Sequence, residues 1–203
     1  RSIELVNALL NVSRIEMGTF SIVPEIISLT GIAEGVLGEL KAKIEEKNIK
    51  LLKQYENAPA SINADSKIAW MIFQNLLSNA VKYTPEGGEV TLEIGVSNEN
   101  VFIKVTDNGY GIPKIEQSKI FEKMYRAENV KTKDIEGNGL GLYIVKSTLE
   151  ASGGTISFKS PAGVRSRTDD TKEECGSEFY VTIPVSGMKP RSGTKVLATT
   201  AEI

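Results

Sequence analysis

Residues 107–112 read Asp-Asn-Gly-Tyr-Gly-Ile and follow directly on two β-like runs, Glu89–Val96 and Val101–Thr106. Four polar residues join the two runs, which predicts a β-hairpin. The two glycines allow positive φ and let the backbone approach a flat ligand closely. An aspartate at the mouth of such a turn can accept a hydrogen bond from an amino group such as adenine N6, and a charged acceptor contributes roughly 1.5–3 kcal/mol in that role. Alone, the hexapeptide also fits a tight turn with an aspartate cap.

A second glycine-rich run, Gly-Asn-Gly-Leu-Gly-Leu at residues 137–142, precedes a predicted helix at 140–151. Its glycines expose consecutive backbone N–H groups, and the helix N-terminus behind them carries about half a positive charge, so the run predicts a phosphate cradle. The dinucleotide fingerprint G-x-G-x-x-G fails because Leu142 takes the place of its third glycine, and the chain holds no Walker-type G-x-x-x-x-G-K-[ST] run. Taken alone, the run is also typical of a simple connector.

A third run, Asn-Leu-Leu-Ser-Asn-Ala-Val-Lys-Tyr at residues 75–83, lies on a predicted helix at 66–82 that Asp65 caps. Asn75 and Asn79 are four residues apart and share a face, and Lys82 falls about one turn further on. An amide oxygen suits Mg²⁺, which completes its coordination shell with phosphates and water. Lys82 can supply the countercharge to a phosphate. The competing interpretation is that the amides form hydrogen bonds within the core or face water.

Hydrophobic periodicity predicts an N-terminal helix at 1–17 and three further helices, at 28–47, 66–82 and 140–151. The β-like runs are 20–27, 49–55, 60–63, 89–96, 101–106, 155–159 and 179–184. The regular alternation of a doubly wound parallel sheet is missing. We therefore expect an α/β (α+β) two-layer sandwich, with a mixed, mostly antiparallel sheet of about five strands packed on three helices.

The amino-acid composition excludes several kinds of binding and catalytic site. The chain has 203 residues, a formal net charge of -2, one cysteine and no histidine. The near-neutral charge gives no bulk attraction to nucleic acid or anionic lipid. The single Cys175 excludes an intramolecular disulfide and a multi-cysteine metal site, and the lack of histidine excludes every His-based catalytic site within this sequence.

The chain resembles the catalytic and ATP-binding domain of bacterial sensor histidine kinases. The resemblance rests on four motifs in this order: the Asn-rich helix, Asp-Asn-Gly-x-Gly, Phe121-Glu-Lys-Met-Tyr-Arg and Gly-x-Gly-Leu-Gly-Leu. That domain belongs to the superfamily shared by gyrase, Hsp90 and MutL-type ATPases. The resemblance covers about residues 19–185 and implies a Bergerat-type sandwich. It also implies that residues 1–18 are the C-terminal end of a dimerisation helix, 19–186 the catalytic domain and 187–203 a flexible tail.

The resemblance assigns roles to individual residues. Asn79 is similar to the Mg²⁺-binding amide, Asp107 to the adenine-reading aspartate, and Arg126 to the arginine that reaches the terminal phosphate. Residues 126–136 would form the ATP lid. The implied catalytic residues are Asn75, Lys82 and Arg126. The implied ATP-binding residues are Asn79, Tyr83, Asp107, Gly109, Gly111, Ile112, Phe121, Lys131, Lys133, Gly137, Gly139, Leu140, Gly141, Leu142 and Ser177.

The implied activity is transfer of the γ-phosphate of Mg·ATP to a histidine on a dimerisation helix that this sequence lacks. The implied partners are that helix and a response regulator receiver domain, in a protein that is a homodimer at full length. We expect a cytoplasmic location, which is compatible with the cytoplasmic part of a membrane-bound sensor, and no contact of this fragment itself with nucleic acid or a membrane. ATPases of the superfamily that activate water carry a glutamate where this chain has Asn75, so we expect poor hydrolysis.

Two departures and two alternatives accompany the resemblance. The last family motif usually has a glycine where this chain has Glu174, and Ser177 stands where threonine is commoner. The loop at 161–174 has no assigned role. One alternative function is an anti-sigma-factor-type protein serine kinase, against which the N-terminal helix argues. The other is a nucleotide-binding sensor that transfers nothing.

Overall fold

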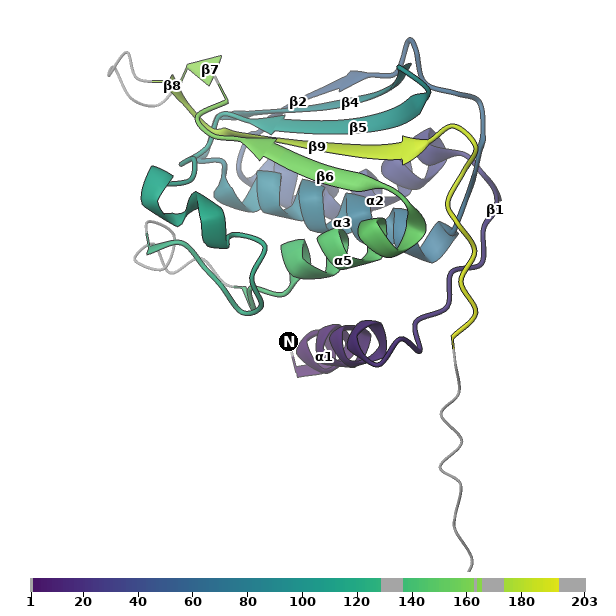
Figure 1. Ribbon diagram of the computed structural model, residues 1–203. Helices are drawn as coiled ribbons and strands as arrows, with labels where there is room; N and C mark the ends of the chain where they lie inside the picture. The colour runs from purple at the N-terminus through teal and green to yellow at the C-terminus, as the bar shows by residue number, and fades with distance from the viewer. Residues whose placement is uncertain (1, 129–136, 163, 166–173, 194–203) are drawn as a thin grey trace, which may run out of the picture.

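A five-stranded mixed sheet forms one layer of the protein in its computed structural model, which describes residues 2–128, 137–162, 164–165 and 174–193 (Figure 1). The strand order is β2-β4-β5-β9-β6. Their bounds are β2 Lys50–Gln54, β4 Glu89–Ser97, β5 Asn100–Asp107, β9 Ser177–Pro184 and β6 Thr155–Lys159. Only the β2–β4 pair in this sheet is parallel, so the expected mostly antiparallel sheet is confirmed.

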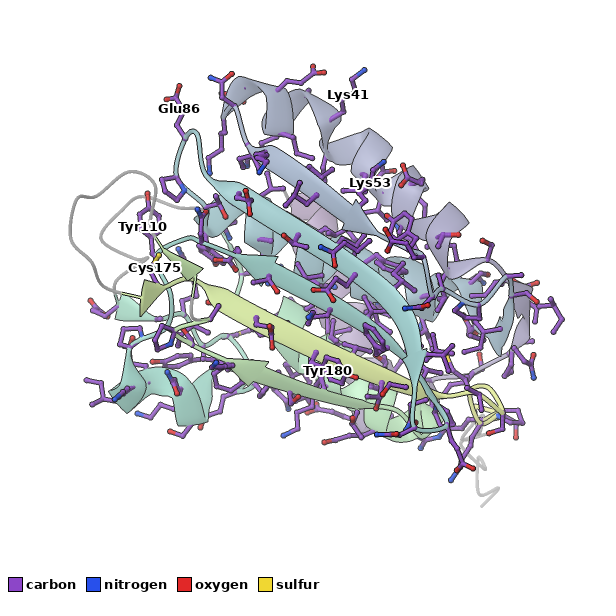
Figure 2. The ribbon with its side chains drawn as sticks, turned by 90° about the horizontal axis from the view of Figure 1, so that it is seen from above. Lys41, Lys53, Glu86, Tyr110, Cys175 and Tyr180 are labelled. Carbon is purple, nitrogen blue, oxygen red and sulfur yellow. The ribbon has the colours of Figure 1, made fainter. Side chains whose placement is uncertain are left out.

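Helices α2 (Leu29–Glu46), α3 (Ser66–Tyr83) and α5 (Gly141–Ser152) lie on one side of this sheet and bury its inner face (Figure 1). The alternating apolar residues of β4, β5 and β9 point into this layer, as their period of two requires. Figure 2 looks onto the other face, where Tyr180 of β9 stacks on Phe102 of β5 with 5.5 Å between ring centroids. The predicted two-layer sandwich is therefore confirmed.

Helix α1 (Ser2–Glu16) lies beyond α5, outside the sandwich (Figure 1). Val12 of α1 joins Leu140 and Ile144 in a small buried cluster of its own. Glu16 at the end of α1 contacts the Lys123 ammonium group. The helix therefore rests against the N-terminal end of α5.

The minor elements follow the sequence expectations only in part: the brief helical piece expected at 114–121 is present, and the others differ. The expected strand at 20–27 is shortened to β1 (Glu25–Ile27), which pairs with β3 (Ile62–Ala64) in a separate two-stranded sheet. A 3₁₀ helix, η1, spans Lys114–Lys119. The loop at 161–174 contains one strand of a short antiparallel pair and the first residue of the other, β7 (Val164–Arg165) and β8 (Glu174–Cys175).

The predicted flexible tail at 187–203 is wrong for residues 187–193. Met188 is only 2% exposed, and its N–H donates to the carbonyl of Asn63 at 2.9 Å. Arg191 forms an antiparallel bridge with Ile22. Gly187, at φ 95°, supplies the turn that returns the chain to the body of the protein. Residues 194–203 lie outside the described residues.

Candidate functional site

Asp107 is the last residue of β5 and is only 5% exposed. Its Oδ1 accepts hydrogen bonds from the N–H groups of Gly109 at 2.9 Å and Ser177 at 3.3 Å. Burial raises the pKa of this carboxyl from 3.8 to about 7, although both hydrogen bonds act to lower it. The side chain is therefore a fixed, buried acceptor whose charge changes near neutral pH.

Glycines allow three backbone segments to meet around Asp107. A Cβ at Gly109 would overlap the carbonyl oxygen of Tyr83 at the end of α3, and a Cβ at Gly176 would overlap the carbonyl of Asp107 itself. Gly176 has φ 81° and Gly111 has φ 64°, which side chains rarely tolerate. The end of β5, the end of α3 and the start of β9 thus form one tightly packed corner. Figure 2 shows Tyr110 and Cys175 at this same end of the sheet.

Ser160 and Gln117 complete this corner and were missed by the sequence reasoning. The Ser160 hydroxyl accepts a hydrogen bond from the N–H of Ile112 at 2.8 Å and donates to the carbonyl of Gly176 at 2.8 Å. The Gln117 amide donates to the carbonyls of Ile112 and Ser160. The sequence gives no signal for this role, because all but one of these hydrogen bonds join residues at least 16 positions apart. The exception is the bond from Gln117 to Ile112.

The last turn of α3 brings Lys82 and Tyr83 to the same region. The Lys82 ammonium group donates to the Tyr83 hydroxyl at 3.1 Å. A Cβ at Gly137 would lie 2.5 Å from the Lys82 ammonium nitrogen. Burial raises the pKa of Tyr83, and the positive charge of Arg126 acts in the opposite direction. Lys82, Tyr83, Arg126 and the first glycine of the second glycine-rich run therefore share one neighbourhood.

Asn75 is a residue of α3 whose side chain lies against the start of α5. Its amide nitrogen donates to the carbonyl of Met71 at 2.8 Å, and a Cβ at Gly141 would overlap its Oδ1. The structure thus gives Asn75 a contact between the two helices. Its implied catalytic role remains a prediction. Asn79, one turn further along α3, is half-buried.

The predicted phosphate cradle falls at the N-terminus of α5 (Gly141–Ser152), and its role in binding phosphate remains a prediction. The N-cap residue of α5, Leu140, is buried and forms no capping side-chain hydrogen bond. The first turn therefore presents backbone N–H groups where the positive end of the helix dipole lies. Gly139, at φ 68°, packs closely against the backbone of Met124, which brings this turn to the Phe121–Arg126 segment.

Phe121 packs edge-on to Phe158 of β6, with 5.8 Å between ring centroids. Leu142 and Ile112 are half-buried and pack against the main core. The remaining predicted contacts, Lys131 and Lys133, lie outside the described residues. The described residues hold no cluster of three or more acidic, histidine or cysteine side chains that could by itself bind a metal. A single amide such as Asn79 is enough only for an ion held mainly by phosphates and water, as Mg²⁺ is.

Residues 64–187 match the family described as histidine kinase-, DNA gyrase B-, and HSP90-like ATPase. The chain belongs to this ATPase family. The matched span contains Asn75–Tyr83, Asp107–Ile112 and Gly137–Leu142, the runs on which the sequence resemblance depended.

Among curated relatives of the ATPase domain, the sensor histidine kinase WalK of Bacillus subtilis is 32% identical over 158 residues. That alignment covers 77% of this chain and 26% of WalK, so the chain spans about a quarter of this relative. The full-length structure of ShkA in complex with AMPPNP has a TM-score of 0.72 at 25% identity, covering 93% of this chain and 36% of ShkA.

A structure of the histidine kinase ThkA in complex with the response regulator protein TrrA has a TM-score of 0.66 at 21% identity. It covers 91% of this chain and 49% of ThkA, and at this identity it shows the fold alone. The predicted resemblance to histidine kinase catalytic domains is confirmed. Across the described part of the ATPase domain and α1, each helix is too short or too polar to cross a bilayer.

Proposed function

We propose that this chain binds Mg·ATP and transfers the γ-phosphate to a histidine, as the catalytic part of a two-component sensor kinase. The observation that carries the proposal is the convergence of the Asp107 turn, the last turn of α3 and the N-terminus of α5 at one end of the sandwich. A buried acceptor suits the adenine amino group, and the uncapped helix N-terminus suits the phosphates.

The chain's own residues would act by positioning and by charge. Lys82 and Arg126 place positive charge beside the start of the second glycine-rich run, where charge develops on a transferred phosphoryl group. Mg²⁺, held by Asn79 together with phosphates and water, would neutralise further charge. Because the sequence contains no histidine, the acceptor belongs to a dimerisation helix outside it. A response regulator receiver domain would then take the phosphoryl group from a homodimeric, cytoplasmic protein.

Calorimetric titration of Mg·ATP into the wild-type chain and into Asp107→Asn tests the adenine assignment. In D107N the amide oxygen keeps the hydrogen bonds from Gly109 and Ser177, so the fold should persist. The amide NH₂ group of D107N then replaces the second carboxylate oxygen. A hydrogen-bond donor therefore faces the adenine amino group, which is also a donor, so binding should be lost. Glu178→Gln, on the neighbouring strand, is the control. Equal affinities of D107N and wild type would sink the assignment.

Phosphotransfer is tested by mixing the chain with labelled ATP and a separate histidine-bearing helix fragment of a sensor kinase. We expect acid-labile label on the fragment, as a phosphohistidine gives. Acid-stable label on serine would favour the serine-kinase alternative. ATP binding without label on the fragment at any ratio would favour a nucleotide-binding sensor.

A further inference from the structure

Lys47, the C-cap residue that follows α2, reaches across to the C-terminus of α3. Its ammonium group donates hydrogen bonds to the carbonyl oxygens of Val81 at 2.8 Å, Lys82 at 3.2 Å and Thr84. The side chain is half-buried, and burial lowers the pKa of this amine, with neighbouring Lys43 acting in the same direction. One ammonium group therefore serves three carbonyls at the end of a neighbouring helix.

The last carbonyls of a helix have no partner within it, and the negative end of the helix dipole lies there. In α3, the carbonyl of Ala80 accepts the N–H of Thr84, and that of Tyr83 accepts the N–H of Tyr110. Lys47 supplies donors to the other carbonyls between Val81 and Thr84. The final turn of α3 is thus closed by a cation from a different helix.

Backbone hydrogen bonds also join the end of α2 to the loop that follows α3. The carbonyl of Lys47 accepts the N–H of Gly87 at 2.8 Å, and Lys50 donates its N–H to the carbonyl of Gly88 at 2.8 Å. Figure 2 shows the loop between α3 and β4, marked by Glu86. The end of α2 is therefore joined to this loop as well as to α3, which gives the Lys47 side chain a fixed base.

We propose that Lys47 is a positioning residue for the nucleotide phosphates, holding the last turn of α3 so that Lys82 and Tyr83 stay directed into the site. This inference rests on the proposed function, because it assumes that Lys82 contacts a phosphate. The hydrogen bonds of the Lys47 ammonium group at this turn go to backbone carbonyls, so it acts through its neighbours. It lies outside every motif of the sequence, and its role follows from the fold alone.

The test compares the affinities of ATP and adenosine for the whole chain, measured by displacement of a fluorescent nucleotide. In Lys47→Met the α3 carbonyls lose their donor and Lys82 loses its fixed position, so ATP should weaken about tenfold or more. Adenosine, which has no phosphate, should weaken by much less. Lys43→Met is the matched control, since it removes an exposed positive charge from the same turn of α2 and should leave both affinities unchanged.

Lys47→Arg should recover much of the ATP affinity, because a guanidinium group can donate to the same carbonyls. In a Lys82→Met background, adding K47M should cost ATP binding little more, since Lys47 acts through Lys82. If K47M does not fold, Lys47→Gln replaces it in the same comparison. Equal losses for ATP and adenosine, or no loss for either, would overturn the proposal. Absence of ATP binding by the wild-type chain would instead defeat the proposed function.

Discussion

At the scale of single residues, Asp107 combines two demands that normally conflict. Burial disfavours its charge, yet a charged carboxylate is the stronger acceptor for an amino group. The N–H groups of Gly109 and Ser177 both donate to Oδ1 and compensate part of the desolvation cost. The result is a carboxyl with a pKa of about 7, poised between its two forms at physiological pH.

This pKa predicts a distinctive pH dependence. The folded-state pKa of about 7 lies above the ordinary value of 3.8, so the folded protein binds more protons between these pH values. Stability from Asp107 is therefore fully present below the ordinary pKa and is lost as pH rises through the folded-state value. Asp107→Asn removes this loss, so the free energy of unfolding of D107N relative to wild type should rise by a few kcal/mol between about pH 4 and pH 8, at roughly 1.4 kcal/mol per pKa unit. Urea unfolding of both proteins across this range measures it, and a difference independent of pH would contradict the assignment.

At the scale of elements, α3 contacts the other segments of the candidate site and is held at both of its ends. Asp65 caps its N-terminus, accepting from the N–H groups of Lys67 and Ile68. Lys47 closes its C-terminus. Between these ends, Asn75 meets the first residue of α5 at Gly141, where a side chain would overlap. The position of the α5 N-terminus, where we propose that the phosphates bind, therefore depends on how closely α3 and α5 approach.

A double-mutant cycle tests this approach. Gly141→Ala should destabilise the protein by about 1–3 kcal/mol, because its methyl group would overlap the Asn75 amide. Asn75→Ala in the same chain should relieve the overlap, giving a coupling energy of about 1 kcal/mol or more. Gly38→Ala in α2 is the control, because a Cβ there meets nothing within 4 Å and should gain about 0.5–1 kcal/mol from helix propensity. Thermal or urea unfolding measures all four variants, and additive effects would argue against the contact.

Elements with strong local patterns could be predicted from the sequence, and contacts between distant residues could not. The helix at 66–82 and the hairpin at 89–106 have regular apolar periods, and both formed within one or two residues of expectation. Ser160 and Lys47 act on partners at least 16 residues away, so their neighbours in sequence reveal nothing. The segment at 187–193 looked mobile because its burial depends on one methionine among polar and small residues.

At the scale of the whole molecule, the C-terminal segment is hydrogen-bonded to the connection between α1 and the sandwich. Ile22, in the connection after α1, donates its N–H to Arg191 at 2.8 Å and accepts the N–H of Arg191 at 3.0 Å. The next residue, Val23, donates to the second carboxylate oxygen of Asp65 at 2.8 Å. The connection between α1 and the sandwich is therefore held at two adjacent residues, Ile22 by the C-terminal segment and Val23 by the aspartate that caps α3.

Met188 is the anchor of this arrangement, so its removal should loosen the connection. Met188→Ala deletes a side chain that is 2% exposed within the main core and should cost about 2–4 kcal/mol in the free energy of unfolding. Met17→Ala, at a methionine 61% exposed, makes the same change outside the core and should cost less than about 0.5 kcal/mol. Amide hydrogen exchange locates the opening: the Ile22 amide should have a lower opening free energy than the Leu76 amide inside α3, because its acceptor is carried by the segment that Met188 anchors, and M188A should lower the Ile22 value further. Equal opening free energies at the two amides would show instead that the segment opens only when the whole domain unfolds.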